Sequence, residues 1–311
     1  MHPGTKPVAV LTGPTGTGKT QFALRLAREF PLEIVSVDSA QVYRGLDIGS
    51  AKPDAAVQAA VPHHLIDLVE PTESYSAGRF VRDAARAIAD IEARGRVPLL
   101  VGGTMLYLRA LIGGIATLPQ GDLVIRAALD ADASRVGWPA MHERLAAVDA
   151  AAAARIHPND AQRIQRALEV HAATGEPISA LQAQTRSPLQ RDFVCVAMIP
   201  TDRARLHTVL AQRFAAMMAA GLLDEVRSLY QRGDLNDELP AIRAVGYRQL
   251  WSHLAGSYSL PIGVDRAVAA TRQLAKRQLT WLRTMPNVKA FDPYDVQSFV
   301  GVRESLTASF G

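Results

Sequence analysis

Residues 8–20 read VAVLTGPTGTGKT, and this stretch decides the fold. VAVLT is a short apolar run typical of a buried strand, and a helical pattern begins near Thr20. Between them lies a match to G-x-x-x-x-G-K-[ST], a loop that binds phosphate through backbone N–H groups, a helix N-terminus and its lysine. The Thr20 hydroxyl can bind Mg2+. The predicted diphosphate site consists of Gly13, Pro14, Thr15, Gly16, Thr17, Gly18, Lys19 and Thr20.

The loop does not identify the molecule that carries the diphosphate. An ATPase, a kinase and a transferase with a diphosphate leaving group all remain open at this point. No late run of four hydrophobic residues ends in an aspartate, so ATP hydrolysis gains no support from the sequence. The stretch SAKPD at 50–54 differs from a guanine-reading motif in residue and position, and we interpret it as a chance similarity.

Strand and helix patterns alternate through the first hundred residues. Residues 97–101 form an unbroken apolar run of the kind found in buried parallel strands. This alternation predicts a doubly wound α/β domain with a parallel sheet. The expected elements are strands at 8–12, 33–37, 65–69 and 97–101 and helices at 20–30 and 76–94.

The pattern changes after residue 113. Alanine-rich helical segments without a strand continue to about residue 191, and we expect Glu169 and His171 there to be surface residues. Strand patterns return at 193–199 and 288–291, with helices at 203–230 and 265–282. We therefore expect an α/β core formed by residues 1–115 and 192–311, interrupted by a helical insertion domain at 116–191.

Composition narrows the class of protein. The 311 residues are 48% hydrophobic, which suffices for a core of normal size. The single cysteine, Cys195, excludes an internal disulfide and a cysteine-based zinc site, and we expect it to be buried on a strand. His63 and His64 have no third ligand spaced nearby, so we expect structural roles for both. No run approaches the roughly 18 apolar residues of a membrane span, so we expect a cytoplasmic protein.

The charge is unevenly distributed. The whole chain has a net charge of +4, yet residues 243–289 contain eight Lys or Arg and one acid, Asp265. This region therefore has a local net charge of +7, which suggests a polyanionic partner. A solvated helix face is the alternative interpretation.

Other predicted strand ends also carry polar groups. Asp38 follows the strand at 33–37, and Gly102, Gly103 and Thr104 follow the strand at 97–101. Ligands of open α/β sheets bind at the carboxyl ends of the strands. Asp38 is thus a candidate proton acceptor or Mg2+ ligand, with a helix cap as its alternative role.

Six motifs carry a resemblance to a known family. After the phosphate loop come DSAQVYRGLDIGSAKP, PHHLIDLVEP, LLVGGTMLYLRALIGG, QRIQRALEV and RAVGYRQLW in this order. The series resembles the bacterial tRNA dimethylallyltransferases, also called tRNA isopentenyltransferases or the IPP transferase family, from the first strand to about Arg283. The resemblance implies a P-loop NTPase-like core that transfers a dimethylallyl group from dimethylallyl diphosphate to the N-6 amine of adenosine-37 of tRNA, with Mg2+.

The resemblance also implies roles for individual residues. Asp38 is the expected general base, Thr104 lies beside the reacting centre, and Lys19 stabilises the leaving diphosphate. Arg126 is expected to contact tRNA or the diphosphate, although LPQGDLVIR replaces the family's L-P-x-A-D-P before it. The expected tRNA contacts are Asp38, Ser39, Ala40, Gln41, Thr104, Arg126, Gln162, Arg163, Ile164, Gln165, Arg166, Arg243, Arg248, Lys276 and Arg283.

Two other classes of protein remain as alternatives. A small-molecule or nucleotide kinase with the same loop would turn over ATP without tRNA. A non-enzymatic RNA-binding protein would not need Lys19, Thr20 and Asp38 together. We expect the transferase, acting as a monomer on the anticodon stem-loop.

Overall fold

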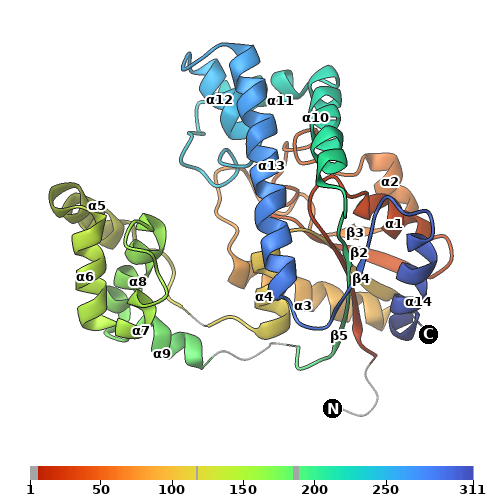
Figure 1. Cartoon of the computed structure of the whole chain (residues 1–311), viewed down its shortest axis with the longest axis horizontal. Coiled ribbons are helices and arrows are strands. Elements are labelled where there is room, and N and C mark those ends of the chain that lie inside the picture. Colours follow the sequence, from red (N-terminus) through yellow and green to blue (C-terminus); the bar gives the residue numbers. More distant parts are fainter. Residues whose placement is uncertain (1–5, 117, 185–188, 311) are drawn as a thin grey trace. The chain divides into compact units, whose positions relative to one another are not determined.

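The computed structural model describes residues 6–116, 118–184 and 189–310 (Figure 1). The chain divides into two compact units. One comprises the described parts of residues 1–112 and 189–311, and the other those of residues 113–188. The helical insertion expected from the sequence spans residues 116–191, so its expected ends differ from these by three residues each. The first unit is an α/β core and the second is helical.

The core unit contains one six-stranded sheet in the order β3-β2-β4-β1-β5-β6. Every pair of neighbours is parallel, which confirms the predicted doubly wound α/β class. Strand β4 lies between β1 and β2, and its Leu99 is in register with both Ala9 and Ile34. The strands are β1 (Val8–Thr12), β2 (Leu32–Val37), β3 (His63–His64), β4 (Val97–Gly102), β5 (Phe193–Met198) and β6 (Val288–Phe291).

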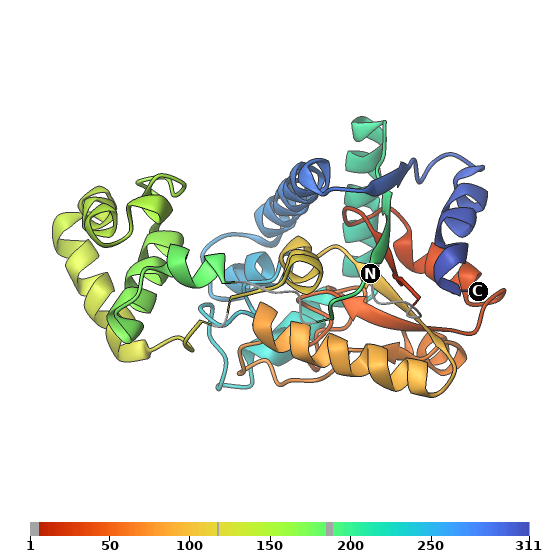
Figure 2. The ribbon, with the colours of Figure 1, turned by 90° about the horizontal axis from the view of Figure 1, so that it is seen from below.

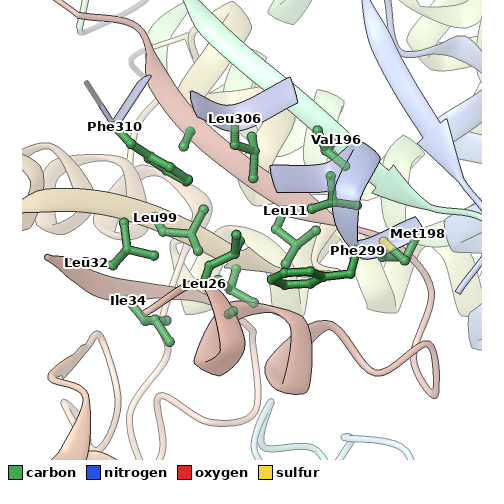
Figure 3. Packing of buried hydrophobic residues seen from close by; sticks show 14 residues of the cluster. Leu11, Leu26, Leu32, Ile34, Leu99, Val196, Met198, Phe299, Leu306 and Phe310 are labelled. Atoms are coloured by element: carbon green, nitrogen blue, oxygen red, sulfur yellow. The ribbon is translucent and has the colours of Figure 1, made fainter. Parts of the chain in front are cut away.

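Helices cover both faces of this sheet. Ala9 and Leu11 of β1 point to a face covered by α1 (Lys19–Leu26) and α14 (Ser298–Phe310), where Phe299, Leu306 and Phe310 pack (Figure 3). Side chains alternate along a strand, so Val10 faces the opposite side, where α3 (Ala77–Ala93) packs against β2 and β4 (Figure 2). Burial on both faces explains the unbroken apolar runs of the sequence.

Among the remaining helices of the core unit, those that were predicted differ from the prediction in their ends. The expected helix at 203–230 is two helices, because Gly221 adopts the left-handed conformation with φ of 100°. The last long helix begins earlier than residue 265, at Leu260, where Pro261 occupies the first turn. These helices are α2 (Ala55–Ala60), α4 (Met105–Gly113), α10 (Arg203–Ala219), α11 (Leu222–Tyr230), α12 (Tyr247–Leu254) and α13 (Leu260–Thr284).

The strand predicted at 65–69 is wrong. The edge strand β3 comprises only His63 and His64, and the chain then leaves the sheet. Leu65 and Asp67 have φ values of 64° and 54°, a left-handed backbone that interrupts a strand. Only an isolated bridge from Tyr43 to Val69 follows. The prediction rested on the apolar residues of this run, and such residues do not by themselves fix an extended backbone.

The helical unit has a core of its own. Leu145, Ile164 and Val170 are fully buried in it. Its helices are α5 (Leu123–Val136), α6 (Trp138–Val148), α7 (Ala150–Ala153), α8 (Ala161–Thr174) and α9 (Ile178–Ala183).

Several smaller expectations are also decided. Cys195 is buried on β5, as predicted, and burial raises the pKa of its thiol to about 11. Both adjacent histidines have structural partners, because His64 Nε2 lies 2.7 Å from Glu33 and His63 Nδ1 lies 2.6 Å from the Val61 carbonyl. No single described helix has the length and apolar character to cross a bilayer. The consecutive helices α10 and α11 reach that length and composition only when they are counted together, across a bend of 63°.

Candidate active site

The phosphate loop connects β1 to α1 and is packed too closely for side chains at two positions. Gly13 and Gly16 have positive φ values of 146° and 82°. A Cβ atom at Gly13 would lie 2.7 Å from the Met198 carbonyl oxygen, and one at Gly16 would lie 2.7 Å from Leu210. The loop is therefore fixed between β5 and α10, and only glycine fits at these two points.

The loop leaves the N-terminus of α1 open to an anion. Gly18 precedes this helix without a side-chain cap, so its first N–H groups have no capping acceptor. The Lys19 ammonium donates a 2.8 Å hydrogen bond to the Pro14 carbonyl, and the Thr17 hydroxyl donates to the same oxygen at 2.9 Å. Uncapped N–H groups and a lysine at the helix start form an anion-binding site.

A second cation lies near this lysine. Burial and, after it, the neighbouring charge of Arg213 lower the pKa of Lys19 to about 8, against the opposing effect of the Asp38 charge. Burial also lowers the pKa of Arg213, and Asp38 again opposes the shift. Two desolvated cations and one carboxylate therefore share a small region at the sheet edge. Such an arrangement attracts a strongly anionic ligand.

Arg213 is a site residue that the sequence interpretation missed. It belongs to α10, where Leu206, Leu210 and Phe214 form the buried face. Positions 206, 210 and 213 follow the i, i+4, i+7 spacing of that face, so a charged residue interrupts an apolar stripe. This interruption is the signal by which the sequence could have identified it.

Asp38 follows β2 and organises the turn after it. Its Oδ1 accepts hydrogen bonds from the backbone N–H groups of Ala40 at 2.8 Å and Gln41 at 3.3 Å. No helix begins at this turn, so the helix-cap alternative is wrong. Within the described chain its Oδ2 takes no hydrogen bond, which leaves one carboxylate oxygen free for a ligand.

Thr104 follows β4, the strand between β1 and β2. Its hydroxyl oxygen accepts a 3.1 Å hydrogen bond from the Ser39 backbone N–H, and its own N–H donates to the Val37 carbonyl at the same distance. The ends of three adjacent strands thus bring together the phosphate loop, Asp38 and Thr104. The structure confirms that these strand ends meet at one edge of the sheet.

The chain after Asp38 is held by buried polar contacts. The Gln41 amide accepts from the Ser36 hydroxyl at 2.8 Å and donates to the Ala51 carbonyl at 3.2 Å, so both of its ends have protein partners. The Lys52 ammonium, whose side chain is 4% exposed, lies 2.5 Å from Asp47 and 2.6 Å from Asp67. Residues 38–52 therefore form an ordered wall of the site.

A cavity of about 650 Å³ lies between this wall and α10. Its lining combines cations and carboxylates with a short apolar surface. Arg213 connects it to the region of Lys19 and Asp38. The lining residues that matter here are Ile48, Lys52, Asp67, Arg213, Ala216 and Met217.

Comparison with known proteins identifies the family. The sequence matches the model described as "IPP transferase" over residues 41–285 and the model described as "Isopentenyl transferase" over residues 6–65. The chain belongs to the IPP transferase family. It is 57% identical to the tRNA dimethylallyltransferase of Paraburkholderia phymatum, with 92% of each chain covered. It is 58% identical to that of Methylibium petroleiphilum, covering 89% of this chain and 86% of the relative.

Solved structures agree with this assignment. The tRNA isopentenylpyrophosphate transferase of Bacillus halodurans is 35% identical with a TM-score of 0.72, covering 98% of this chain and 97% of that one. A eukaryotic dimethylallyltransferase solved acting on tRNA is 27% identical with a TM-score of 0.80, covering 97% and 78%. The predicted P-loop NTPase-like core is thereby confirmed as the core of this transferase family.

In the helical unit, Arg126 and Arg166, two of the tRNA contacts expected from the family resemblance, bind the buried carboxylate of Glu169. Glu169 is 1% exposed, which overturns the expectation that it lies on the surface. Its carboxylate accepts from Arg126 at 2.8 Å, from Arg166 at 2.7 Å and from the Asp122 backbone N–H at 2.8 Å. Burial alone would raise the pKa of Glu169, but these donors lower it overall. The two half-exposed arginines are thus held by one anion.

The other residues of this unit that were expected to contact tRNA differ in their exposure to solvent. Gln162 and Arg163 on α8 are exposed, whereas Ile164 is fully buried in the core of the unit. The Gln165 amide donates a 2.7 Å hydrogen bond to Asp130. The side chain of Ile164 therefore supports its exposed neighbours and is not itself accessible to a ligand.

The basic segments of the core unit carry free cations. Arg243, Arg248, Lys276 and Arg283 are all exposed, and none has an ion-pair partner within the part of the chain that the structure describes. Other arginines of the described chain do form ion pairs, as Arg94 does with Glu33. The local positive charge is therefore available to an external polyanion.

Mg2+ was expected at Thr20. Among the described residues, no three His, Cys, Asp or Glu side chains gather in a metal-binding cluster. Mg2+ usually takes one or two protein oxygens and completes its shell with water and phosphate oxygens. The Thr20 hydroxyl at the start of α1 is a hard oxygen donor of this kind, so the residue fits the ion.

Proposed function

We propose that this protein transfers the dimethylallyl group of dimethylallyl diphosphate to the N-6 amine of adenosine-37 in the tRNA anticodon stem-loop, as a cytoplasmic monomer. Its relatives are named tRNA dimethylallyltransferases, after the transfer of this group to tRNA. The observation that carries the proposal is that Lys19, Arg213 and Asp38 lie close together at the edge of the sheet where the strands end. A leaving diphosphate needs the two cations, and an attacking amine needs the carboxylate.

The loop and the two cations activate the leaving group. The allylic C–O bond breaks with its electron pair moving to the diphosphate, which gains negative charge as the bond lengthens. The N–H groups of the loop, Lys19 and Arg213 are already oriented and partly desolvated, so they stabilise that charge without reorganisation. Mg2+ held by Thr20 and the diphosphate would supply further charge neutralisation.

Asp38 accepts the proton. The adenine nitrogen uses its lone pair to form the new C–N bond, and its N–H becomes acidic as this bond forms. Asp38 Oδ1 is occupied by the turn, whereas Oδ2 is free to take the proton. A carboxylate suffices as the base because the proton is lost from a cationic nitrogen. The Thr104 hydroxyl accepts a hydrogen bond from the N–H of Ser39, the residue after Asp38, and thereby holds this turn in place.

The cavity beside Arg213 suits a short hydrocarbon attached to a diphosphate. Ile48, Ala216 and Met217 provide apolar contacts, and the guanidinium provides the anion-binding end. A five-carbon prenyl chain needs only a small apolar surface, and pockets of this kind combine such a surface with a few oriented polar groups. The site thus favours a prenyl diphosphate over a nucleotide.

The free cations of the core unit provide a surface for the RNA backbone. Within the part of the chain that the structure describes, Arg243, Arg248, Lys276 and Arg283 have no ion-pair partners to lose when they bind phosphate. The target amine is stacked within the anticodon loop, so the base must be drawn out, at a cost of a few kcal/mol. Backbone contacts and splayed bases are the usual means by which RNA loops are bound. Arg126, Gln162, Arg163 and Arg166 of the helical unit are proposed to add contacts.

The decisive experiment is a transfer assay. Purified protein and Mg2+ are incubated with an unmodified anticodon stem-loop and labelled dimethylallyl diphosphate, with ATP in a parallel reaction. Label in the RNA from the prenyl donor supports the proposal. Phosphate release or transfer from ATP without label in the RNA would instead make the protein a kinase.

A further inference from the structure

Gln278 is a buried amide in the middle of α13. It is 8% exposed, whereas its neighbours Lys276 and Arg277 point to solvent. Its Nε2 donates a 2.9 Å hydrogen bond to the Gly103 carbonyl, and its Oε1 accepts a 2.9 Å hydrogen bond from the Thr15 backbone N–H. Both ends of one side chain are therefore bound to backbone groups that are far away in the sequence.

The contact with Thr15 fixes the phosphate loop. One loop N–H group points to Gln278, so a bound diphosphate must use the N–H groups that follow it, together with Lys19. The loop has no other contact of its backbone N–H groups with a side chain among the hydrogen bonds of the described residues. Gln278 thus determines where the loop begins its turn around the diphosphate.

The contact with Gly103 fixes the opposite side of the site. Gly103 precedes Thr104, which holds the turn after Asp38 through the Ser39 N–H. A Cβ atom at Gly103 would lie 2.5 Å from Gln278 Nε2 and 2.9 Å from the Gly13 carbonyl. Only glycine at position 103 lets the Gln278 amide come this close to the backbone, so the contact requires both Gly103 and Gln278.

We propose that Gln278 is a positioning residue that holds the diphosphate loop and the turn of the catalytic base at a fixed separation. This inference rests on the proposed function. In-line transfer needs the reacting atoms aligned, and a misplacement of about 1 Å can cost roughly 100-fold in rate. Because Gln278 is buried, it acts on the two protein segments and does not contact RNA itself, although it lies within the stretch from Lys276 to Arg283.

The main test replaces Gln278 by Leu, which has a similar volume and neither hydrogen bond. Titration with inorganic diphosphate in Mg2+ should show an affinity about tenfold weaker, and kcat/KM for dimethylallyl diphosphate should fall by about tenfold or more. The Kd for an anticodon stem-loop should stay within about threefold, because the exposed cations are unchanged. Gln273→Leu, the same change at an exposed position of α13, should behave as the wild type.

A second variant separates positioning from folding. Gln278→Glu keeps the size and the acceptor for Thr15 but places an oxygen against the Gly103 carbonyl. Its kcat should fall about tenfold, and its diphosphate affinity should fall at least as far as in the Leu variant, because the new carboxylate also repels the anion. This result decides the matter if Gln278→Leu does not fold. Wild-type diphosphate affinity and turnover in the folded variants would overturn the proposal.

Weaker RNA binding with unchanged diphosphate affinity would also overturn it, because Gln278 would then be an RNA contact. The diphosphate titration does not depend on prenyl transfer. If the wild-type protein transfers no label to RNA, the proposed function fails, while the effect of Gln278 on the phosphate loop is still measured.

Discussion

The Tyr247 hydroxyl donates a 2.6 Å hydrogen bond to Oε1 of Glu225. The same carboxylate accepts from the backbone N–H groups of Asp47, Ile48 and Gly49, which line or adjoin the cavity. Burial raises the pKa of Tyr247, and the charge of Glu225 raises it further, so the phenol remains a donor. One carboxylate from α11 therefore links the cavity wall to the start of α12, next to the free cation Arg248.

Glu225→Gln should disorder this wall. Each oxygen of the carboxylate accepts from two of the four donors, so an amide would place its NH2 group against two of them. The contacts of the remaining oxygen would also weaken, because hydrogen bonds to a charged group contribute about 1.5–3 kcal/mol. We expect a loss of about 2 kcal/mol in the free energy of unfolding, measured in urea, and a fall of about tenfold in kcat/KM for the prenyl donor.

Tyr247→Phe removes one donor and should have a smaller effect. We expect a loss of about 1–2 kcal/mol in the free energy of unfolding. The matched control is Tyr230→Phe, whose ring packs on Trp251 and whose side chain is 37% exposed. Equal stability in all three variants would show that the carboxylate does not organise the wall.

Asp38→Asn tests the base without disturbing its turn. Asparagine keeps an oxygen that accepts from the Ala40 and Gln41 N–H groups but cannot take a proton. Turnover should fall by about 100- to 10,000-fold, the usual contribution of a positioned base. The Kd for tRNA should stay within a few fold for both Asp38→Asn and Asp38→Ala. A near-wild-type rate in the Asn variant would remove Asp38 as the base.

Diphosphate binding should weaken as the pH rises through about 8, because burial lowers the pKa of Lys19 to that value. Below this pH the ammonium is charged and attracts the anion; above it the neutral amine does not. Lys19→Ala should bind weakly at pH 7, and its affinity should change much less with pH. Titrations of both proteins with inorganic diphosphate should therefore converge above about pH 9. Parallel curves across this range would exclude Lys19 as the titrating group.

The strand edge of the site was predictable because its residues directly follow strands. Asp38 and Thr104 stand next to apolar runs, and the phosphate loop has a fixed spacing of Gly, Lys and Thr. In parallel strands, adjacency in sequence to a strand end becomes adjacency in space. The pattern along the chain thus located three of the groups that meet at this edge.

The residues supplied by helices were not predictable in this way. Glu225 and Gln278 reach the site because α11 and α13 pack against it, and no local pattern states where a helix will pack. Arg213 on α10 is marked in the sequence only by its interruption of an apolar stripe. Glu169 was misplaced for the same reason, since its burial depends on two arginines that come from different helices. The strand expected at 65–69 failed because Leu65 and Asp67 adopt left-handed conformations that composition does not reveal.

Lys276→Ala should weaken tRNA binding and flatten its dependence on salt. Each phosphate contact releases counterions, so one lost contact reduces the slope of log K against log salt by roughly 0.7–0.9. Arg243→Ala should act in the same direction. The control is Arg135→Ala, whose side chain is exposed but already paired with Asp132. Unchanged slopes for both test variants would exclude these segments as the docking surface for the RNA backbone.

Glu169→Gln should destabilise the helical unit and loosen Arg126 and Arg166 together. Burial tends to raise the pKa of Glu169, but the donors lower it below the ordinary value of 4.5. Its contribution to stability is therefore present above about pH 4.5 and is lost as the pH falls through the lower value of the folded state. The wild type should lose unfolding free energy more steeply than the Gln variant between about pH 5 and 3.

The same variant should also bind tRNA more weakly at pH 7, because the two arginines are no longer held by one anion. Asp132→Asn is the matched control, since that carboxylate pairs with Arg135 and Arg144 on an exposed surface. Its effect on stability should be much smaller than that of Glu169→Gln, because exposed ion pairs are screened by solvent. Identical pH profiles for Glu169→Gln and the wild type would show that the buried carboxylate does not stabilise the unit through its charge.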